Sequence, residues 1–434
     1  MASAITVKTS PPEYNPVYNP INICVYESDA TSRGKTNYKY IIYLTIQSGA
    51  GLGDEFQFQV PLGTANNLFY GVQDVSRVLE KYIVENLPPV TLDSGFFAAQ
   101  DSPIIEFDLD VYSGWDVAGV FTEDPDGVGA VSVRTRYCWS ASFKHHDWID
   151  QLNEATPFNT WLCNATNGTS AKFLSNNPDF KARLTDLGYT YAMTDDPGNI
   201  DLMVMKTYDI DDNVIDSIEI SNPLGATPVA NRIWCVSTAP GSLNNIQNGY
   251  ITGALQPIIG SDVSYYTIYL DKTGAGGESS ETITVTLEED CRYESYRLHF
   301  LNELGGFDYF NFLSKSQLSS QAKRKTYTKS EVLIETAGIN YENRYNGKAD
   351  YYVESVDKLK LRSDYITGAQ MDWLKELIES PLVYLEFENT KGDKDYKPLV
   401  VTTSRWVQKI DSIDKLFKLE LDVEFAHLNQ RQRR

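Results

Sequence analysis

The residues best suited to chemistry are two adjacent histidines followed by an aspartate, His145, His146 and Asp147. Imidazole and carboxylate groups are ligands that a transition metal accepts. The other histidines of the chain, His299 and His427, are distant in sequence. Adjacent side chains on a strand also point to opposite faces, so the two histidines would not converge on one ion. We therefore expect a solvated strand end here and no metal site.

Acidic residues form a second group of candidates. Residues 209–213 read Asp-Ile-Asp-Asp-Asn, which resembles the start of a calcium-binding loop. Such a loop needs glycine at its sixth position and glutamate at its twelfth, where this chain has Val214 and Ile220. Strand patterns flank the segment, so we predict a hairpin turn. We interpret the acidic residues 288–290 as a charged strand end rather than the paired acid and base of an active site.

The glycine-containing stretches do not match nucleotide-binding loops. Residues 34–36 read Gly-Lys-Thr, but the position of the first glycine of a phosphate-binding loop holds Asp29. Residues 49–53 lack the third glycine of a dinucleotide loop and lead into no helical pattern, so we predict a turn between strands. A Gly-x-Ser-x-Gly motif is absent from the sequence. The sequence therefore predicts no catalytic residue, no cofactor and no enzyme activity.

Composition excludes several classes of protein. The 434 residues carry 38 basic and 59 acidic side chains, a net charge of −21. Because phosphate binding needs surplus Lys and Arg, this balance argues against coating nucleic acid or docking on anionic lipid. Hydrophobic residues make up 42% of the chain, enough to fill cores and to exclude global disorder. No apolar run is long enough to cross a bilayer, and we expect no secretion signal.

Cysteine spacing bears on the redox compartment. The five cysteines are odd in number and far apart, which favours reduced, packed thiols made in a cytoplasm over a disulfide framework or a zinc cluster. They are Cys24, Cys138, Cys163, Cys235 and Cys291.

Charge is distributed unevenly along the chain. Residues 291–434 hold 23 basic and 22 acidic side chains, whereas residues 1–290 hold 15 basic and 37 acidic ones. The acidic part either serves solubility or forms a negative wall facing something that must not adhere to it.

The pattern of apolar residues indicates mainly strands. Period-two alternation bounded by Gly, Pro, Asn and Asp is typical of antiparallel sandwiches with one buried face. It occurs at residues 38–46, 104–112, 202–208, 265–270, 281–287 and 417–425. Helical spacing is confined to residues 74–84 and to a capped helix at about 368–379, in which Thr367 and Gln370 form a capping box. We therefore predict a mainly β fold, all-β to α+β, of tandem antiparallel sandwich-like domains with a few short helices.

Three regions are expected from these patterns. Residues 1–135 comprise an N-terminal arm and a sandwich-like domain, residues 136–290 an acidic, loop-rich β domain, and residues 291–434 a C-terminal β domain carrying the capped helix. The arm is rich in proline, so we expect it to run extended over a neighbouring surface. Its marker residues are Tyr14, Pro16, Tyr18 and Pro20.

Residues 296–312 predict a strand, a glycine turn and a returning aromatic strand. Gly305 and Gly306 would supply the positive φ that a tight turn needs. Asn302 and Asp308 could hydrogen-bond the turn backbone. The aromatic residues of the return strand cannot all share one face, so one side of the hairpin is expected to meet another layer or another subunit. These residues are Phe307, Tyr309 and Phe310.

This segment resembles the "LNxxGGxDxFxF" signature of tail structural proteins from tailed phages and prophages of Bacteroidota, a group that includes the crAss-like phages. Further stretches resemble the same family in order along nearly the whole chain. They are residues 14–21, 74–79, 173–178, 377–384, 397–401 and 415–421, with Ser175 and Asn177 departing from the commoner residues.

The resemblance implies a virion structural protein without catalytic activity: a tail or neck ring, adaptor, hub or distal-tail component, assembled in the host cytoplasm. It implies a cyclic homo-oligomer of six- or twelve-fold symmetry, partnered by other tail or neck proteins. Genome DNA would pass its lumen without specific binding, since acidic walls repel phosphates. The alternative is a receptor- or carbohydrate-binding tail module. That interpretation requires tryptophans exposed in a cleft, the candidates being Trp115, Trp139, Trp148 and Trp161.

Overall fold

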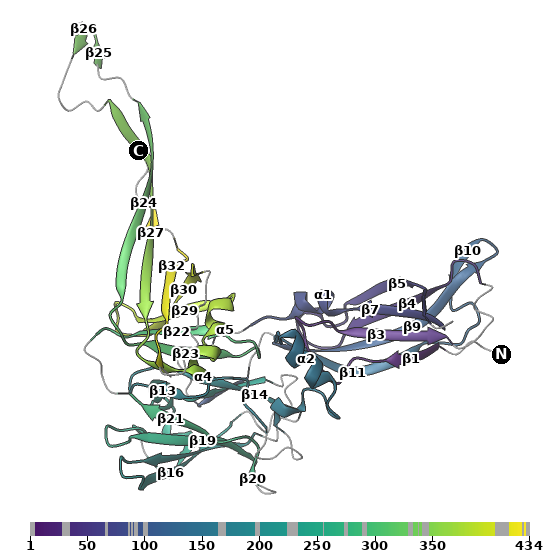
Figure 1. Ribbon diagram of the computed structural model, residues 1–434, viewed down its shortest axis with the longest axis horizontal. Helices are drawn as coiled ribbons and strands as arrows, with labels where there is room; N and C mark the ends of the chain where they lie inside the picture. Colours follow the sequence, from purple (N-terminus) through teal and green to yellow (C-terminus); the bar gives the residue numbers. More distant parts are fainter. Residues whose placement is uncertain are drawn as a thin grey trace. The chain divides into compact units, whose positions relative to one another are not determined.

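The computed structural model divides the chain into two compact units (Figure 1). Unit 1 comprises residues 1–288 and 302–308, and unit 2 comprises residues 289–301 and 309–434. The expected boundary after residue 135 falls inside a strand, and the three-region division stays a prediction.

The structure describes residues 5–27, 35–65, 68–85, 87, 90, 94–98, 103–163, 171–195, 200–223, 233–254, 256–272, 277–288, 293–328, 333–336, 338–340, 347–403, 416–427 and 429–430. Expectations for Gly34, Glu289, Asp290 and Cys291 lie outside these residues.

The first part of unit 1 contains two sheets that share one core. The first sheet has the order β1-β3-β7-β6 and the second the order β2-β11-β9-β4-β5, with β10 on β9. The strands are β1 (Ile5–Thr9), β2 (Tyr14–Pro16), β3 (Asn22–Glu27), β4 (Lys39–Ile46), β5 (Glu55–Pro61), β6 (Gly63–Ala65), β7 (Leu68–Asp74), β9 (Ile104–Val117), β10 (Val120–Glu123) and β11 (Val131–Trp139). Buried side chains from both sheets, such as Ile23 and Leu109, belong to one cluster, as in a sandwich.

Two further sheets complete unit 1. Their orders are β12-β14-β17-β8 and β13-β21-β19-β15-β16-β18, with β20 on β19. The strands are β8 (Phe96–Ala98), β12 (Leu162–Cys163), β13 (Phe180–Ala182), β14 (Tyr189–Thr194), β15 (Leu202–Tyr208), β16 (Val214–Ser221), β17 (Ile233–Ser237), β18 (Ile251–Thr252), β19 (Tyr265–Lys272), β20 (Gly277–Glu278) and β21 (Ile283–Leu287). The helical segments of unit 1 are η2 (Gly49–Gly51), α1 (Ser76–Leu79), η3 (Glu80–Tyr82), α2 (His145–Leu152), η4 (Asn159–Trp161), α3 (Pro240–Leu243) and η7 (Asn248–Tyr250).

Unit 2 is organised around one large sheet of order β23-β22-β29-β30-β32-β27-β24, with β33 on β27. Its strands are β22 (Tyr296–Leu301), β23 (Phe307–Phe312), β24 (Gln317–Thr328), β27 (Lys348–Arg362), β29 (Val383–Glu388), β30 (Lys394–Val401), β32 (Glu420–Phe425) and β33 (Asn429–Gln430). Smaller pairs are β25 (Leu333–Glu335) with β26 (Gly338–Asn340), and β28 (Ile366–Thr367) with β31 (Leu416–Phe417). Helices α4 (Gly368–Trp373) and α5 (Lys375–Glu379) pack Trp373, Leu374 and Leu377 into the core of this unit.

The mainly β prediction is confirmed, and the alternation explains it. On β4 the side chains of Ile42, Leu44 and Ile46 are fully buried, and they lie opposite buried residues of β9 such as Leu109. Every second side chain of a strand faces the same side, so this spacing covers one face with apolar groups. The sheets are not purely antiparallel, because β2, β12 and β13 each pair in parallel with a partner strand.

The predicted helices and turns are also present. The helix expected at 368–379 forms as α4 and α5, and Thr367 and Gln370 make the capping box. The helical pattern at 74–84 appears as the short α1 and η3. Residues 209–213 join β15 to β16 as predicted, with the Asp209 carboxylate accepting the backbone N–H groups of Asp211 and Asn213. The turn expected at 49–53 joins β4 and β5.

Candidate functional site

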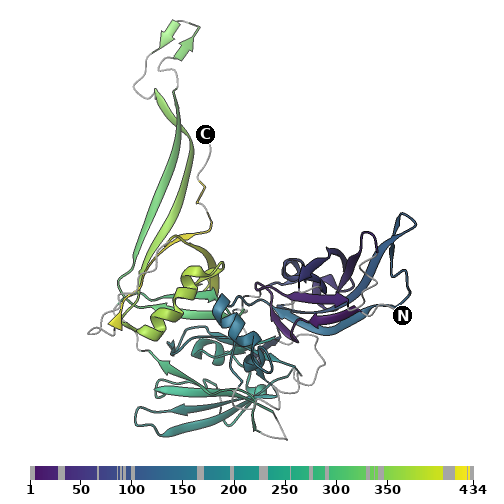
Figure 2. The same ribbon diagram turned by 45° about the vertical axis from the view of Figure 1, so that its right-hand side comes forward.

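Strand β24, in which every residue is exposed, and its partner β27, most of whose residues are half-buried, form a pair that we call the ribbon (residues 317–328 and 348–362). Figures 1 and 2 show these strands leaving the body of the unit together. All twelve residues of β24 are exposed, although the strand is paired with β27 along its length, with one register shift between Lys325 and Thr326. Such a strand buries little apolar surface, so its pairing with β27 is what keeps it extended.

Most of the ribbon has only its own two strands for support. The strand β32 pairs with β27 only from Lys358 to Arg362, and β33 pairs only with Glu354 and Ser355. Within the described residues, the part of β27 before Glu354 pairs with β24 alone. An isolated two-stranded hairpin is marginally stable in water, so this part of the ribbon gains little stability from the rest of its unit.

Basic side chains are concentrated on β24. Lys323, Arg324 and Lys325 are consecutive, and the Arg324 guanidinium pairs with the Asp350 carboxylate across the ribbon at 2.9 Å. Successive residues of a strand point to opposite faces, so the three cations are divided between the two faces. Sequence reasoning missed this element because residues 317–328 contain almost no apolar side chains, and hydrophobic periodicity therefore gives no strand signal there.

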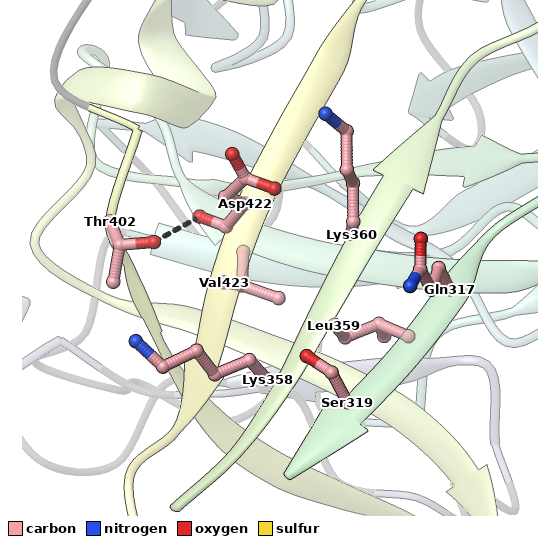
Figure 3. A pocket seen from close by; sticks show the side chains of 8 residues that line it. All are labelled: Gln317, Ser319, Lys358, Leu359, Lys360, Thr402, Asp422 and Val423. Atoms are coloured by element: carbon pink, nitrogen blue, oxygen red, sulfur yellow. Dashed lines mark hydrogen bonds between the residues drawn. The ribbon is translucent and has the colours of Figure 1, made fainter. Parts of the chain in front are cut away.

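A hollow of about 350 Å³ lies at the base of the ribbon, between β24, β27 and β32 (Figure 3). Its lining lysines are already paired: Lys358 with Glu424, and Lys360 with Glu420 at 2.9 Å. The Thr402 hydroxyl donates to the backbone oxygen of Asp422. Each lysine that lines the hollow therefore already has a carboxylate, and the hollow is poorly suited to an incoming anion. Its lining residues are Gln317, Ser319, Lys358, Leu359, Lys360, Thr402, Asp422 and Val423.

Unit 2 also contains a buried charge cluster on β22, β29 and β30. The Glu386 carboxylate lies 3.1 Å from the ring nitrogen Nε2 of His299, 3.5 Å from Nε of Arg297 and 3.0 Å from Nζ of Lys394. The side chains of Arg297, His299 and Glu386 are at most 2% exposed. The Arg297 guanidinium also donates to Asn311 and stacks on the ring of Tyr309. Sequence spacing places Arg297 and His299 on one face of a strand, but only the sheet topology brings Glu386 to them.

The cluster sets the ionisation of the Glu386 carboxylate. Burial favours the neutral form of Glu386, but the hydrogen bond with His299 and the positive charges of Arg297, His299 and Lys394 outweigh it. The pKa of Glu386 is therefore held below its ordinary value of 4.5. We interpret this as a structural ion cluster and assign it to the stability of unit 2.

Acidification should remove this stabilisation. Because the folded-state pKa of Glu386 lies below the unfolded value, the ionised carboxylate stabilises the fold above about pH 4.5, and that stability is lost as the pH falls through the folded pKa. We expect the melting-temperature difference between the wild type and Glu386→Gln to be largest at neutral pH and to shrink below about pH 4.5. A difference that is independent of pH would contradict the assignment.

The predicted glycine turn at 302–308 belongs to unit 1 and is tightly held there. The Asn302 side chain accepts the N–H groups of Leu304 and Gly306 and donates to the Leu174 backbone oxygen at 2.8 Å. The indole N–H of Trp139 donates to the Leu304 backbone oxygen at 3.1 Å. The expected turn-bonding role of Asn302 is thus confirmed, while that of Asp308, which is buried, stays a prediction.

The two glycines of this turn have different physical roles. Gly305 has a φ of +87° and approaches Ser140 so closely that a Cβ atom would overlap its backbone oxygen. Gly306 has no positive φ, so the expectation for it was wrong. It is required by close approach instead, since its Cβ atom would lie 2.7 Å from the Leu174 backbone oxygen.

The aromatic residues after the turn are covered within their own units. Phe307 packs near Tyr191 in unit 1. In unit 2, Tyr309 is buried beneath Arg297, and the half-buried Phe310 packs on Phe312 and Trp373. These four contacts use both sides of the strand, so the motif does not present a free aromatic face.

The N-terminal arm runs extended as β2 and packs on a strand of its own unit. Tyr14 and Pro16 lie in β2, which adds in parallel to β11, and both are buried. The Tyr14 ring stacks on Tyr137 with centroids 5.3 Å apart. Pro20 and Tyr18 are exposed, and the Tyr18 hydroxyl donates to Glu85. The arm is therefore an edge strand, stabilised by ladder hydrogen bonds that its sequence does not reveal.

Removing one amide from the arm should destabilise unit 1. The buried Asn19 donates to the backbone oxygen of Phe143 at 2.9 Å and accepts its N–H at 2.8 Å. Asn19→Ala leaves both backbone groups unsatisfied, at roughly 1–3 kcal/mol each. We expect a lower free energy of unfolding in urea titration, and Gln47→Ala, whose exposed side chain donates to the Asp108 carboxylate, should change little. Equal effects of the two substitutions would contradict this account.

The histidine motif forms a helix start rather than a strand end, so that expectation was wrong. His145 and His146 begin α2, and His146 Nδ1 lies 3.1 Å from the Asp150 carboxylate one turn later. None of the residues of this helix is buried, and Trp148 and Leu152 are half-buried. Within the described residues, no group of three or more histidine, cysteine or acidic side chains could hold a metal ion.

The cysteines and tryptophans are mostly core residues. Cys138, Cys163 and Cys235 are free and buried, and burial raises the pKa of the Cys163 thiol to about 12. Trp139 is fully buried, and Trp115 and Trp161 are each 8% exposed, while Trp148 is half-buried. Three of the four tryptophans required for a sugar platform are therefore occupied in packing. The helices of the described segments include none long and apolar enough to cross a membrane.

Comparison with known proteins adds little to this description. No protein-family model and no curated protein sequence matches the chain. One solved structure, the full extracellular region of plexin A4 (domains 1 to 10), is similar over 96% of this chain and 34% of its own length, with 9% sequence identity and a TM-score of 0.17. The chain thus spans about a third of that structure, and a TM-score this low carries no argument about fold or function.

Proposed function

We propose that this chain is a structural protein of a bacteriophage virion, a ring, adaptor, hub or distal-tail component of the DNA-conducting tail. Its partners are copies of itself, in a cyclic oligomer of six- or twelve-fold symmetry, and other tail or neck proteins. The role is non-catalytic and is carried out in the virion tail after assembly in the host cytoplasm. The ordered motifs, from the arm at residues 14–21 to the segment 415–421, support the family assignment.

The observation that carries the proposal is the exposed ribbon. A twelve-residue strand in which every residue is exposed is costly to keep ordered in a free monomer. An assembly that covers the ribbon would supply the missing burial. A structural subunit repeated around a ring presents such a covering surface at every position.

The uneven charge supports the same role. Unit 1 carries 15 basic and 37 acidic residues, whereas unit 2 carries 23 and 22. In the proposed ring, acidic residues of unit 1 line the lumen and repel DNA phosphates, so the genome slides without binding. The alternative of a carbohydrate-binding module is not favoured, because Trp115, Trp139 and Trp161 are buried.

Electron microscopy of the native particle, with an antibody against this chain, tests the proposal. We expect label at the neck or tail, on a ring of countable symmetry. Label on fibres or spikes, or the absence of the chain from any particle, would overturn it and favour the receptor-binding alternative. Acidic residues of unit 1 that face outward in a reconstruction would overturn the sliding role alone.

A further inference from the structure

We propose that Asn248 is a site of spontaneous modification, at which the side-chain amide is lost and the residue becomes aspartate or isoaspartate. The inference concerns the chemistry of this chain by itself and does not depend on the proposed virion role. Asparagine is a chemically labile residue, and asparagine followed by glycine occurs at residues 167–168, 248–249 and 346–347. Of these pairs, only Asn248 with Gly249 lies wholly within the described residues.

Gly249 provides the nucleophile, its backbone nitrogen. Asn248, Gly249 and Tyr250 form the single helical turn η7, and both Asn248 and Gly249 are exposed. The first N–H groups of a helical turn have no acceptor within it, and no described residue accepts the N–H of Gly249. Glycine has no side chain to shield this nitrogen. The nitrogen is therefore free to attack Cγ of the neighbouring Asn248, an intramolecular step that proximity favours.

The side-chain carbonyl of Asn248 is already polarised for this attack. The backbone N–H of Gln256 donates to Oδ1 of Asn248 at 3.2 Å. Negative charge develops on this oxygen when a nucleophile adds to Cγ, and a donor already aimed at the oxygen stabilises that charge. Gln256 is itself held in place, because its side-chain amide donates to the backbone oxygens of Leu243 and Ile246. The loop thus directs both a nucleophile and an oxyanion donor at the amide of Asn248.

The reaction needs water and no other reagent. The Gly249 nitrogen gives its proton to water and bonds to Cγ of Asn248, and the bond from Cγ to Nδ2 breaks to release ammonia. Water then opens the resulting succinimide ring. Attack of water at Cγ gives aspartate, whereas attack at the backbone carbonyl carbon of Asn248 gives isoaspartate, in which the main chain runs through the side chain. Either product replaces a neutral amide with a carboxylate.

Peptide mapping of the full-length protein by mass spectrometry tests the proposal. The folded protein is incubated in mildly acidic and in mildly alkaline buffer, and the peptide that contains Asn248 is followed over time. We expect aspartate and isoaspartate to accumulate there, faster in alkaline buffer because the attacking nitrogen must lose its proton. Asn245 is the internal control: it is also exposed, but the buried, β-branched Ile246 follows it, and it should stay unmodified.

Gly249→Ala is the matched variant. A Cβ atom at this position would meet no atom within 4 Å, and Gly249 has no positive φ, so the variant should fold like the wild type. Its methyl group hinders the approach of the nitrogen to Cγ, and the conversion of Asn248 should slow severalfold. A wild type that keeps Asn248 intact in alkaline buffer would overturn the proposal. Equal rates in the wild type and in Gly249→Ala would contradict attack by the Gly249 nitrogen.

Unfolding separates the contribution of the loop from that of the sequence pair. In guanidinium chloride the N–H of Gln256 no longer faces Oδ1 of Asn248, whereas Gly249 remains its neighbour. We expect the folded protein to convert Asn248 at least as fast as the unfolded chain does. Slower conversion in the folded protein would show that the Gln256 N–H does not assist, and would overturn the assignment of an oxyanion donor.

Conversion should also affect the strand that follows. The turn η7 leads directly into β18, which pairs with β16 through Ile251 and Thr252. Isoaspartate lengthens the backbone just before this strand, so the pairing should weaken. We expect faster hydrogen exchange in β18 of aged protein than of fresh protein, and no change on ageing in Gly249→Ala. Identical exchange in fresh protein and in aged protein that carries isoaspartate at position 248 would contradict this effect on the strand.

Discussion

Glu386→Gln is expected to destabilise unit 2 by roughly 3–5 kcal/mol, because it removes the carboxylate that lies 3.5 Å from Nε of the buried Arg297 guanidinium. Removing one member of a buried charge cluster is costly, whereas the intact cluster only approximately repays its desolvation. The glutamine keeps the shape of the side chain, so the loss reports the charge and not a cavity. We expect hydrogen exchange in β22 and β29 to accelerate strongly and the melting temperature to fall.

An exposed ion cluster provides the matched comparison. Glu420 contacts Lys360 at 2.9 Å and Arg362 at 3.0 Å, but its side chain is 52% exposed. Water screens such pairs, so Glu420→Gln should leave the melting temperature nearly unchanged. If the two glutamine substitutions lower stability equally, burial is not what makes the Glu386 cluster important.

Gly305→Ala is expected to destabilise unit 1 severely. An alanine at a φ of +87° costs roughly 1–2 kcal/mol, and the overlap of its Cβ atom with Ser140 adds roughly 1–3 kcal/mol. The displaced turn would also weaken the hydrogen bond from the Trp139 indole to Leu304. Urea unfolding followed by tryptophan fluorescence should show a lower midpoint, with the fluorescence change including the buried Trp139.

Gly392 separates the cost of the positive φ from the cost of the steric overlap. It has the same φ of +87°, but the nearest atom to an added methyl group would be a Glu388 side-chain oxygen at 3.7 Å. Gly392→Ala should therefore cost only the conformational part, roughly 1–2 kcal/mol. Equal losses at Gly305 and Gly392 would mean that the turn at 302–308 can shift away from Ser140, and that its close packing contributes little.

Several features follow from the sequence because their causes are local. The strands β4 and β9 are specified by alternation of apolar side chains, which needs no knowledge of distant residues. Thr367 and Gln370 cap α4 through bonds between residues three positions apart. The Asp209 turn and the Asn302 turn likewise form through side chains that bond the nearby backbone. The proposed function is of another kind, since it combines the resemblance of the ordered motifs with the exposed ribbon, and electron microscopy of the particle tests it.

Other features were decided by pairings between residues far apart in the chain. The arm at Tyr14 is buried because β11, more than a hundred residues away, offers it a strand edge. Glu386 meets Arg297 because β29 pairs with β22. Gly306 is needed because Leu174 approaches it, and no turn rule predicts that contact. The ribbon has the weakest sequence signal, since strand pairing alone defines β24. The sequence by itself thus determined the elements whose hydrogen bonds and apolar spacing are local. The tertiary structure decided register, burial and open edges, because these depend on which distant backbone groups meet.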